Sequence, residues 1–354
     1  MHYLVTGHTG FKGAWLVLML KERGHIVSGL ALEPAPGSLY ERARLSTLLL
    51  HDLRVDIRDA AATQRAIVAV KPDVVLHLAA QPLVRESYRD PRYTYETNTL
   101  GTLNVLNAVE HSPTCRAQVV ITTDKVYRNV NQIWGYRESD PLGGVDPYSA
   151  SKAAADLITQ CWMASSGSSV PTAIARAGNV IGGGDVCAER LMVDLVAAFS
   201  SGQAVRLRHP EAVRPWQHVL DCLSGYLELT NALLGGESSG EAFNFGPDTG
   251  SFVAVGAVAS AVASLWGPDS VVELDEGTHV HEATLLSLDS RKAELAFGWQ
   301  NRMQFRDALQ WTVAWEKQVR AGEDARMVTI AQISEFERLS SAVRDSVPAG
   351  GPPR

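Results

Sequence analysis

The sequence predicts an α/β fold, in which a doubly wound parallel sheet of the Rossmann type is followed by a smaller C-terminal lobe. Two observations lead to this prediction. Short apolar, β-branched runs alternate with amphipathic stretches through the first half of the chain, as strands and crossover helices do. A glycine-rich motif directly follows the first of these runs, at the place where such sheets bind nucleotides.

The predicted elements of the first half follow in chain order. Strands are expected at residues 3–5, 26–31, 74–78 and 119–122, with another ending near residue 55. Helices are expected at residues 15–23, 62–70 and 100–109. The strands are largely apolar along their length, which is typical of a sheet with helices on both faces.

The second half begins with a helix that contains Tyr148 and a buried strand at residues 172–176. Beyond them the pattern is less regular, with a strand expected at residues 241–246 and helices at 253–265 and 330–341. The predicted domains are residues 1–175 for the sheet, 176–325 for a second lobe with some segments returning to the sheet, and 326–354 for a tail. The last few residues carry no apolar run and are expected to be disordered.

Composition excludes several classes of protein. A net charge of -7 without any Lys/Arg-rich run argues against a nucleic-acid binder, and 45% hydrophobic with 20% charged residues is typical of a globular protein. The four cysteines are widely spaced, so neither a disulfide framework nor a metal site is expected. Without a leader-like start or a membrane-length apolar run, the prediction is a cytoplasmic protein with no membrane partner.

The glycine motif reads Thr6-Gly7-His8-Thr9-Gly10-Phe11-Lys12-Gly13 and lies between a predicted strand and a predicted helix. Glycines there permit a tight turn and bring backbone N–H groups close to a pyrophosphate at the helix N-terminus. The residues predicted to bind a dinucleotide here are Gly7, Thr9, Gly10, Phe11, Lys12 and Gly13.

Tyr148 and Lys152 are spaced one helical turn apart, which places both side chains on one helix face. With the Lys152 ammonium beneath the ring, the phenolate of Tyr148 would be favoured, as a tyrosine base at neutral pH requires. Thr123 follows a predicted strand at the carboxyl edge of the sheet, where its hydroxyl can share a substrate proton. This trio predicts hydride transfer at a sugar or alcohol carbon.

Asp124 and Lys125 follow Thr123 directly, and simple hydride exchange needs neither. An added acid and base imply a second step, such as dehydration of an oxidised sugar. In that scheme carbon 4 is oxidised, the acidified carbon 5 loses a proton, carbon 6 loses its hydroxyl, and the hydride returns to carbon 6.

The Gly-x-x-Gly-x-x-Gly spacing resembles the extended short-chain dehydrogenase/reductase superfamily, and longer strings resemble its CDP-glucose 4,6-dehydratases. The similarity runs over residues 1 to about 320, and the strings are residues 7–15, 77–85, 140–148, 176–185 and 214–220. The resemblance implies NAD as cofactor, with Asp56 and Ile57 at the adenine and Leu78, Ala79, Ala80, Tyr148 and Lys152 at the nicotinamide ribose.

The resemblance also implies roles at the reaction centre. Thr123 and Tyr148 would assist hydride transfer, Asp124 would be the acid at carbon 6, and Lys125 stands where related dTDP-sugar dehydratases carry a glutamate base. A lysine there acts either as a base of lowered pKa or through its charge on the enolate. The residues expected to bind the nucleotide sugar are Gln81, Arg85, Asn179, Arg190, Arg214 and Trp216.

The choice between NAD and NADP depends on the end of the second strand, where an acidic residue selects a free ribose hydroxyl. Glu33 is the nearby candidate, although it lies two or three residues past the expected strand end and is equally plausible as a solvated loop carboxylate. The sequence has no arginine immediately there to meet a ribose phosphate. NAD is therefore predicted over NADP.

Two other functions and one assembly stay open at this point. An NDP-sugar 4-epimerase shares the Thr, Tyr and Lys machinery, and a non-catalytic NAD-sensing protein would share the glycine motif. Val186 stands where the family usually has tryptophan, which leaves the nucleotide base and the sugar open. The superfamily commonly forms homodimers through a four-helix interface, here expected from the helices at residues 100–110 and 148–163.

Overall fold

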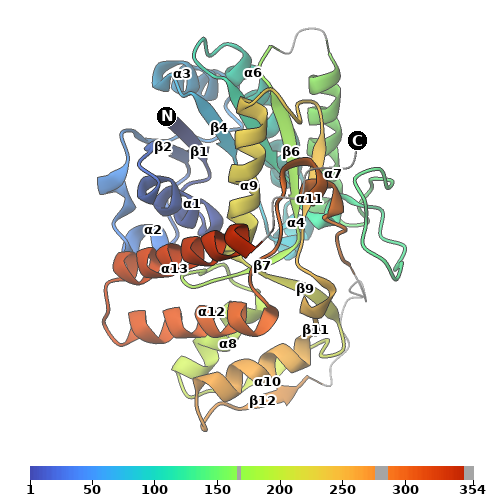
Figure 1. The fold of residues 1–354 in the computed structure, drawn as a ribbon. Coiled ribbons are helices and arrows are strands. Elements are labelled where there is room, and N and C mark those ends of the chain that lie inside the picture. The colour runs from blue at the N-terminus through green and yellow to red at the C-terminus, as the bar shows by residue number, and fades with distance from the viewer. Residues whose placement is uncertain (166–168, 276–285, 347–354) are drawn as a thin grey trace.

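The computed structural model describes residues 1–165, 169–275 and 286–346. Within these residues the larger part is a seven-stranded sheet in the order β10-β6-β5-β4-β1-β2-β3, and every neighbouring pair is parallel (Figure 1). The strands are β1 (His2–Thr6), β2 (Ile26–Ala31), β3 (Asp52–Arg54), β4 (Val74–His77), β5 (Ala117–Ile121), β6 (Thr172–Ala177) and β10 (Ala242–Phe245). The predicted doubly wound α/β fold is confirmed.

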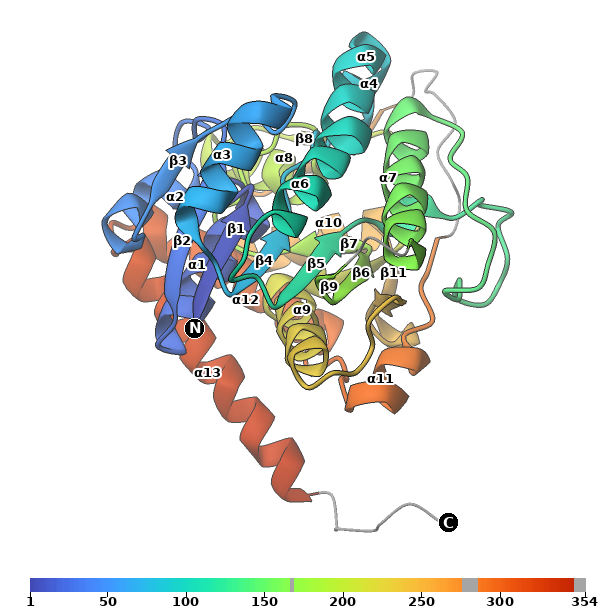
Figure 2. The same cartoon turned by 90° about the horizontal axis from the view of Figure 1, so that it is seen from above.

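Helices cover both faces of this sheet (Figure 2). One face carries α1 (Phe11–Glu22), α9 (Val219–Leu234) and α13 (Ala325–Ser346), and the other carries α3 (Ala60–Val70), α6 (Gly101–Glu110) and α7 (Pro147–Ala164). In β1, Tyr3 and Val5 pack into the cluster of α1, whereas Leu4 packs into that of α3 and α6. Both sides of each central strand are buried, which explains why the strands are apolar rather than alternating.

The smaller lobe lies beyond the carboxyl edge of the sheet and has its own core (Figure 1). Its described strands are β7 (Asn179–Ile181), β8 (Val205–Leu207), β9 (Val213–His218), β11 (Phe252–Ala254) and β12 (Val272–Leu274). They form one sheet in the order β11-β9-β7 and another in the order β12-β8. Helices α8 (Leu191–Ser200), α10 (Val255–Trp266) and α12 (Phe305–Arg320) pack beside them around Leu195, Val258 and Leu309.

The chain crosses between the two parts more than once. After β9, helix α9 returns to the face of the large sheet that carries α1. Strand β10 then pairs with β6 and forms one edge of that sheet. Residues 326–346 lie in α13, whose Val328, Ile333 and Phe336 are buried in the same cluster as α1. The remaining described helices are the short α2 (Leu39–Arg42), α4 (Val84–Arg89), α5 (Pro91–Tyr95) and α11 (Arg291–Phe297). The predicted domain limits of the chain stay predictions.

Two features are absent from the described residues. No helix in these ranges is long and apolar enough to span a bilayer. The same ranges contain no group of three or more His, Cys, Asp or Glu side chains arranged to hold a metal ion. The predicted disordered end of the chain lies outside the described residues.

Candidate active site

The glycine motif forms the turn between β1 and α1. Gly7 has φ +74°, and a Cβ there would lie 2.8 Å from the Ala79 backbone nitrogen, so only glycine fits this close approach. A Cβ at Gly13 would collide with the Gly7 carbonyl oxygen. The Thr6 hydroxyl joins the turn to β4 through His77 Nδ1 (2.7 Å) and accepts from the Ala79 N–H (3.2 Å). These contacts bring the turn beside Leu78 and Ala79, and the binding of a cofactor by residues 78–80 stays a prediction.

The N-terminus of α1 has the features of an anion site. Gly10 is its N-cap, and within the described chain no side chain caps this end. The first N–H groups of the helix therefore keep their capacity to bind a pyrophosphate, assisted by the helix dipole. The residues present fit a dinucleotide here.

Lys12 is directed into the protein rather than along this surface. Its Nζ donates a hydrogen bond to the Tyr226 hydroxyl on α9 (3.1 Å) and lies 5.6 Å from the centroid of that ring. Tyr226 is fully buried. The sequence carries no local signal for this contact, because it joins residues more than 200 positions apart.

Asp56 and Ile57 follow β3, which ends at Arg54, and are predicted to contact the adenine. The Asp56 carboxylate accepts hydrogen bonds from the Arg58 N–H (2.9 Å) and from its Nη2 (2.6 Å). Ile57 is 4% exposed, and a Cβ at Gly101 would lie 2.6 Å from its Cδ1. Asp56 is thus held by Arg58, and Ile57 is packed against the start of α6.

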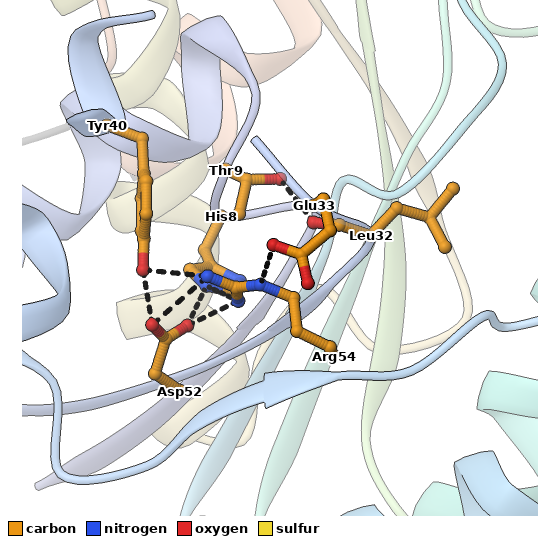
Figure 3. Close-up of polar contacts among 7 residues, drawn as sticks. All are labelled: His8, Thr9, Leu32, Glu33, Tyr40, Asp52 and Arg54. Atoms are coloured by element: carbon orange, nitrogen blue, oxygen red, sulfur yellow. Dashed lines mark hydrogen bonds and ion pairs between the residues drawn. The ribbon is translucent and has the colours of Figure 1, made fainter. Parts of the chain in front are cut away.

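The expectation that no arginine stands near Glu33 is wrong. Strand β3 lies next to β2 and ends at Arg54, and the Arg54 Nε donates to Glu33 Oε2 (3.1 Å, Figure 3). The arginine escaped sequence analysis because it belongs to the neighbouring strand rather than to the segment that follows β2. Arg54 also donates to both oxygens of Asp52 (2.5 and 3.1 Å) and to the Tyr40 hydroxyl (3.0 Å).

The reaction centre is built from the end of β5 and the first turn of α7. Asp146 caps α7 by accepting from the Ser149 N–H (2.9 Å), and Pro147 starts the helix, so Tyr148 projects from its first turn. Thr123 donates to Asp124 Oδ1 (2.9 Å) and also hydrogen-bonds Tyr148. Lys125 Nζ lies 5.9 Å from the centroid of the Tyr148 ring. The four residues predicted from the Thr-Asp-Lys segment and from Tyr148 are brought together.

Burial sets the protonation of the two acids in this group. It raises the pKa of the Tyr148 phenol to about 12, against the lowering effect of the hydrogen bond between Thr123 and Tyr148. It also raises the pKa of Asp124, against the lowering effects of Lys125, Thr123 and Arg214. Asp124 is 2% exposed, and a Cβ at Gly178 would lie 2.9 Å from its Oδ2, so the glycine leaves room for the carboxyl. A carboxyl of raised pKa is suited to donate a proton.

Lys152 is not directed where sequence analysis placed it. Its Nζ donates to the Ile121 carbonyl at the end of β5 (2.9 Å), while the lysine beside the Tyr148 ring is Lys125. Burial and the positive charge of Lys12 lower the pKa of Lys152 to about 8. Tyr148 and Lys152 keep their i, i+4 spacing in α7. The lysine side chain is long enough, however, for its Nζ to reach a backbone carbonyl of the sheet.

Two predicted substrate arginines lie near this centre. Arg190 is the N-cap of α8, pairs with Asp185 through Nη1 (2.7 Å), and is close enough to Tyr148 to lower its pKa. Arg214 lies on β9 and lowers the pKa of Asp124. Asn179 is half-buried at the start of β7, where it pairs with Trp216 of the neighbouring strand β9. These positions suit recognition of a diphosphate.

The other predicted substrate residues are engaged elsewhere. Trp216 is 5% exposed in the core of the smaller lobe, and its Nε1 donates to the Val253 carbonyl (2.9 Å). Gln81 is buried and bonds Thr94 (2.8 Å) and the Leu83 carbonyl (3.0 Å). Arg85 forms an ion pair with Glu189 (3.3 Å). These three residues therefore have partners of their own within the chain, and their part in substrate binding stays a prediction.

A protein-family model described as GDP-mannose 4,6 dehydratase matches residues 4–312. The chain belongs to this family. One family relative, the CDP-glucose 4,6-dehydratase of Salmonella typhimurium (strain LT2), is 42% identical over 341 residues, which cover 94% of this chain and 95% of the relative. The dTDP-glucose 4,6-dehydratase of Streptomyces griseus is 29% identical over 89% of this chain and 93% of its own length. The predicted resemblance to nucleotide-sugar 4,6-dehydratases is confirmed.

Solved structures of family members and their relatives share the fold. The dTDP-glucose 4,6-dehydratase of Streptomyces venezuelae, solved with NAD bound, has a TM-score of 0.77 and 26% identity, covering 92% of this chain and 100% of that chain. A UDP-glucose-4-epimerase from Stenotrophomonas maltophila has a TM-score of 0.80 and 22% identity, covering 91% and 100%. The latter likeness concerns the fold alone.

Proposed function

We propose that this chain is an NAD-dependent lyase that converts CDP-glucose to CDP-4-dehydro-6-deoxyglucose. The observation that carries the proposal is the buried Asp124 carboxyl, joined through Thr123 to Tyr148 at the end of β5. Hydride transfer alone does not need a second acid, so the presence of Asp124 implies a further step. The 42% identity with a CDP-glucose 4,6-dehydratase supports CDP-glucose as substrate.

The first step is oxidation of carbon 4. Tyr148 accepts the proton of the carbon 4 hydroxyl as a phenolate, a form that burial disfavours and that the hydrogen bond with Thr123 and the charge of Arg190 favour. NAD, when bound, would supply the redox chemistry of the site by taking up a hydride and giving it back. The glycine turn and the uncapped N-terminus of α1 would hold its pyrophosphate.

The second step is loss of water across carbons 5 and 6. Lys125 assists removal of the carbon 5 proton, either as the base or through its charge on the enolate. Asp124 gives its proton to the carbon 6 hydroxyl, which leaves as water. A hydride then adds to carbon 6 and a proton to carbon 5, so that the sugar has lost one water in total. The raised pKa of Asp124 favours the protonated acid that this step consumes.

Binding of the nucleotide diphosphate falls to the two arginines and the asparagine of the smaller lobe. Arg190 and Arg214 influence the pKa of Tyr148 and Asp124, so a diphosphate bound to them would hold its sugar at the reaction centre. Val186 and Cys187 follow Asp185, the partner of Arg190, where the family usually has a tryptophan. A change at this position would act on the preference for the nucleotide base, which a comparison of nucleotide sugars measures.

A panel of CDP-, dTDP-, GDP- and UDP-sugars tests the proposal. The expected result is a 4-keto-6-deoxy product from CDP-glucose, identified by loss of one water in mass spectrometry. A hexose epimer of unchanged mass would instead identify a 4-epimerase, and Asp124 is the feature that argues against that enzyme. If no sugar bound in calorimetry while NAD did, the chain would be a cofactor sensor.

The assembly and location proposed for this enzyme are those of the wider superfamily. A homodimer would form by pairing α6 and α7 with their copies in a four-helix interface. Leu157 of α7 is 53% exposed and Leu100, directly before α6, is 52% exposed, which supports contact with another apolar surface. We place the enzyme in the cytoplasm.

A further inference from the structure

The chain between β7 and α8 begins with Gly182-Gly183-Gly184-Asp185, which we call the 182–185 segment. Its three glycines are buried, and the chain then leads to Arg190, the N-cap of α8. The side chains that bind the segment belong to helices more than 100 positions away in the sequence, one on the large sheet and one in the smaller lobe. The segment therefore lies where the two parts of the molecule meet.

Two tryptophans enclose Gly183. Trp15 of α1 donates from its Nε1 to the Gly183 carbonyl (2.9 Å). A Cβ at Gly183 would collide with the ring of Trp315 on α12, so only glycine fits beside that ring. Both tryptophans are fully buried. Close packing and one hydrogen bond therefore fix the first half of the segment.

Gly184 is held by a carboxylate of α12. Its N–H donates to Glu316 Oε1 (2.8 Å), and its φ of +78° turns the chain toward Asp185. The Glu316 side chain is 7% exposed, and its other oxygen lies 3.5 Å from the Nε of Arg320, one helical turn further on. Without this acceptor the buried N–H would lose its hydrogen bond. Glu316 thus ties the segment to α12.

A cavity of about 120 Å³ borders this part of the chain. Its lining includes Gly184, Val186, Glu316 and, from α8, Met192 and Val196. Protein interiors are close-packed, so a segment beside an unfilled space has room to shift once a hydrogen bond is removed. The hydrogen bond from Gly184 to Glu316, more than packing, therefore fixes the second half of the segment.

Asp185 connects the segment to the reaction centre. Its side chain is 10% exposed, its Oδ1 accepts from the Cys187 N–H (3.0 Å), and its Oδ2 accepts from the Arg190 Nη1 (2.7 Å). Both carboxylate oxygens are thus engaged, so the position of Asp185 decides where the Arg190 guanidinium lies. Arg190 is close enough to Tyr148 to lower the pKa of its phenol. A continuous series of contacts joins Glu316 to the reaction centre.

We propose that Glu316 is a positioning residue for the substrate, which keeps Arg190 in place to bind the diphosphate by fixing Gly184 and Asp185. Glu316 acts through the backbone of the segment and not by contact with the nucleotide sugar. An arginine that is already held in its binding position loses less conformational freedom when the diphosphate binds. This inference rests on the proposed function, because it requires that Arg190 bind the diphosphate of a nucleotide sugar.

The test measures the dissociation constant of CDP, which has the diphosphate but no sugar to react, by calorimetry on the full chain. Glu316→Leu removes the acceptor, and CDP should bind about tenfold more weakly or worse. Glu316→Gln keeps an oxygen that accepts from Gly184, and burial raises the pKa of the Glu316 carboxyl, so a neutral side chain suits the position. This variant should stay within about threefold of the wild type. In a chain with Arg190→Met, Glu316→Leu should add less than about a twofold loss, because both changes remove one contact.

Ser290→Ala is the matched control, because the Ser290 Oγ accepts from the N–H of another glycine, Gly246 (2.8 Å). It should leave CDP affinity within about twofold of the wild type. If urea denaturation shows that Glu316→Leu does not fold, Glu316→Ser replaces it, since the space it leaves admits a water to the Gly184 N–H while the tie to α12 is still lost.

Three results would overturn the proposal: unchanged CDP affinity in the folded variant that lacks the acceptor, an equal loss in Glu316→Gln or Ser290→Ala, or a full further loss in the chain with Arg190→Met. Failure of the wild type to bind CDP would instead contradict the proposed function on which the inference rests.

Discussion

Tyr148 and Lys152 respond to burial in opposite directions. Burial raises the pKa of the phenol to about 12 and, with the charge of Lys12, lowers the pKa of the ammonium to about 8. Loss of water disfavours the charged form of each group, which is the phenolate for one and the ammonium for the other. Near neutral pH the lysine is still mostly protonated, so it can supply a positive charge to the edge of the sheet. A further lowering of the Lys152 pKa would remove this positive charge near neutral pH.

Lys12 should control the alkaline side of the pH profile. Replacing Lys12 with Met removes a positive charge near Lys152, so the pKa of Lys152 should rise above about 8 and the lysine should keep its proton to higher pH. We expect the alkaline limb of kcat/KM, measured at saturating cofactor, to move upward in pH by a few tenths of a unit or more. Lys21→Met, on the same helix, is the control. A limb that stays in place or moves downward would show that Lys12 does not act on Lys152.

At the scale of elements, the sheet and α7 are joined by a buried ion pair. Arg176 of β6 and Asp156 of α7 are 1% and 0% exposed in their side chains and form two hydrogen bonds of 2.8 Å. The Arg176 Nη1 also donates to the Tyr127 hydroxyl (2.8 Å), and the Thr122 hydroxyl donates to Asp156 (3.0 Å). This network fixes α7, which carries Tyr148, against β6, which precedes Asn179 in the chain.

Asp156→Ala should destabilise the protein strongly. The substitution leaves a buried guanidinium without its carboxylate, which typically costs about 3–5 kcal/mol of unfolding free energy. Urea denaturation followed by circular dichroism measures the change. Glu273→Ala breaks the exposed Arg206–Glu273 pair, with side chains 73% and 47% exposed, and should cost less than about 1 kcal/mol. Similar losses in both variants would contradict the importance given to the buried pair.

The sequence predicted the central strands, the glycine turn and α7 because their signals are local: apolar runs, glycine spacing, and a cap followed by proline. It did not predict the meeting of Arg54 with Glu33 or of Lys12 with Tyr226, because these contacts depend on which strands and helices become neighbours. The hydrogen bond from Trp216 to the Val253 carbonyl shows the same limit, since it joins two strands of the smaller lobe that are distant in the sequence. The tilt of a long side chain such as Lys152 is likewise decided by distant backbone carbonyls.

At the scale of the whole molecule, the proposed dimer gives α7 two tasks. One face carries Tyr148 and the buried Asp156, and Leu157 projects outward with 53% exposure. A dimer that pairs α6 and α7 with their copies would cover Leu157 and stiffen the helix that holds the reaction centre. Catalysis and assembly would then share one element.

Leu157→Glu should weaken the dimer. A charge buried at an apolar contact loses hydration without gaining a partner, so the dissociation constant of the dimer should rise by about tenfold or more. Light scattering over a dilution series measures the molecular mass. Leu295→Glu, at a position 72% exposed on α11, should leave the mass unchanged. A wild-type chain with the mass of one protomer at all concentrations would refute the dimer.

The central claim is that one active site oxidises carbon 4, eliminates water and returns the same hydride to carbon 6. The most direct measurement uses CDP-glucose labelled with deuterium at carbon 4, with the product analysed by mass spectrometry and NMR. We expect a product lighter by one water that retains the deuterium, now on carbon 6. A product of unchanged mass that keeps its deuterium on carbon 4 would contradict this reaction.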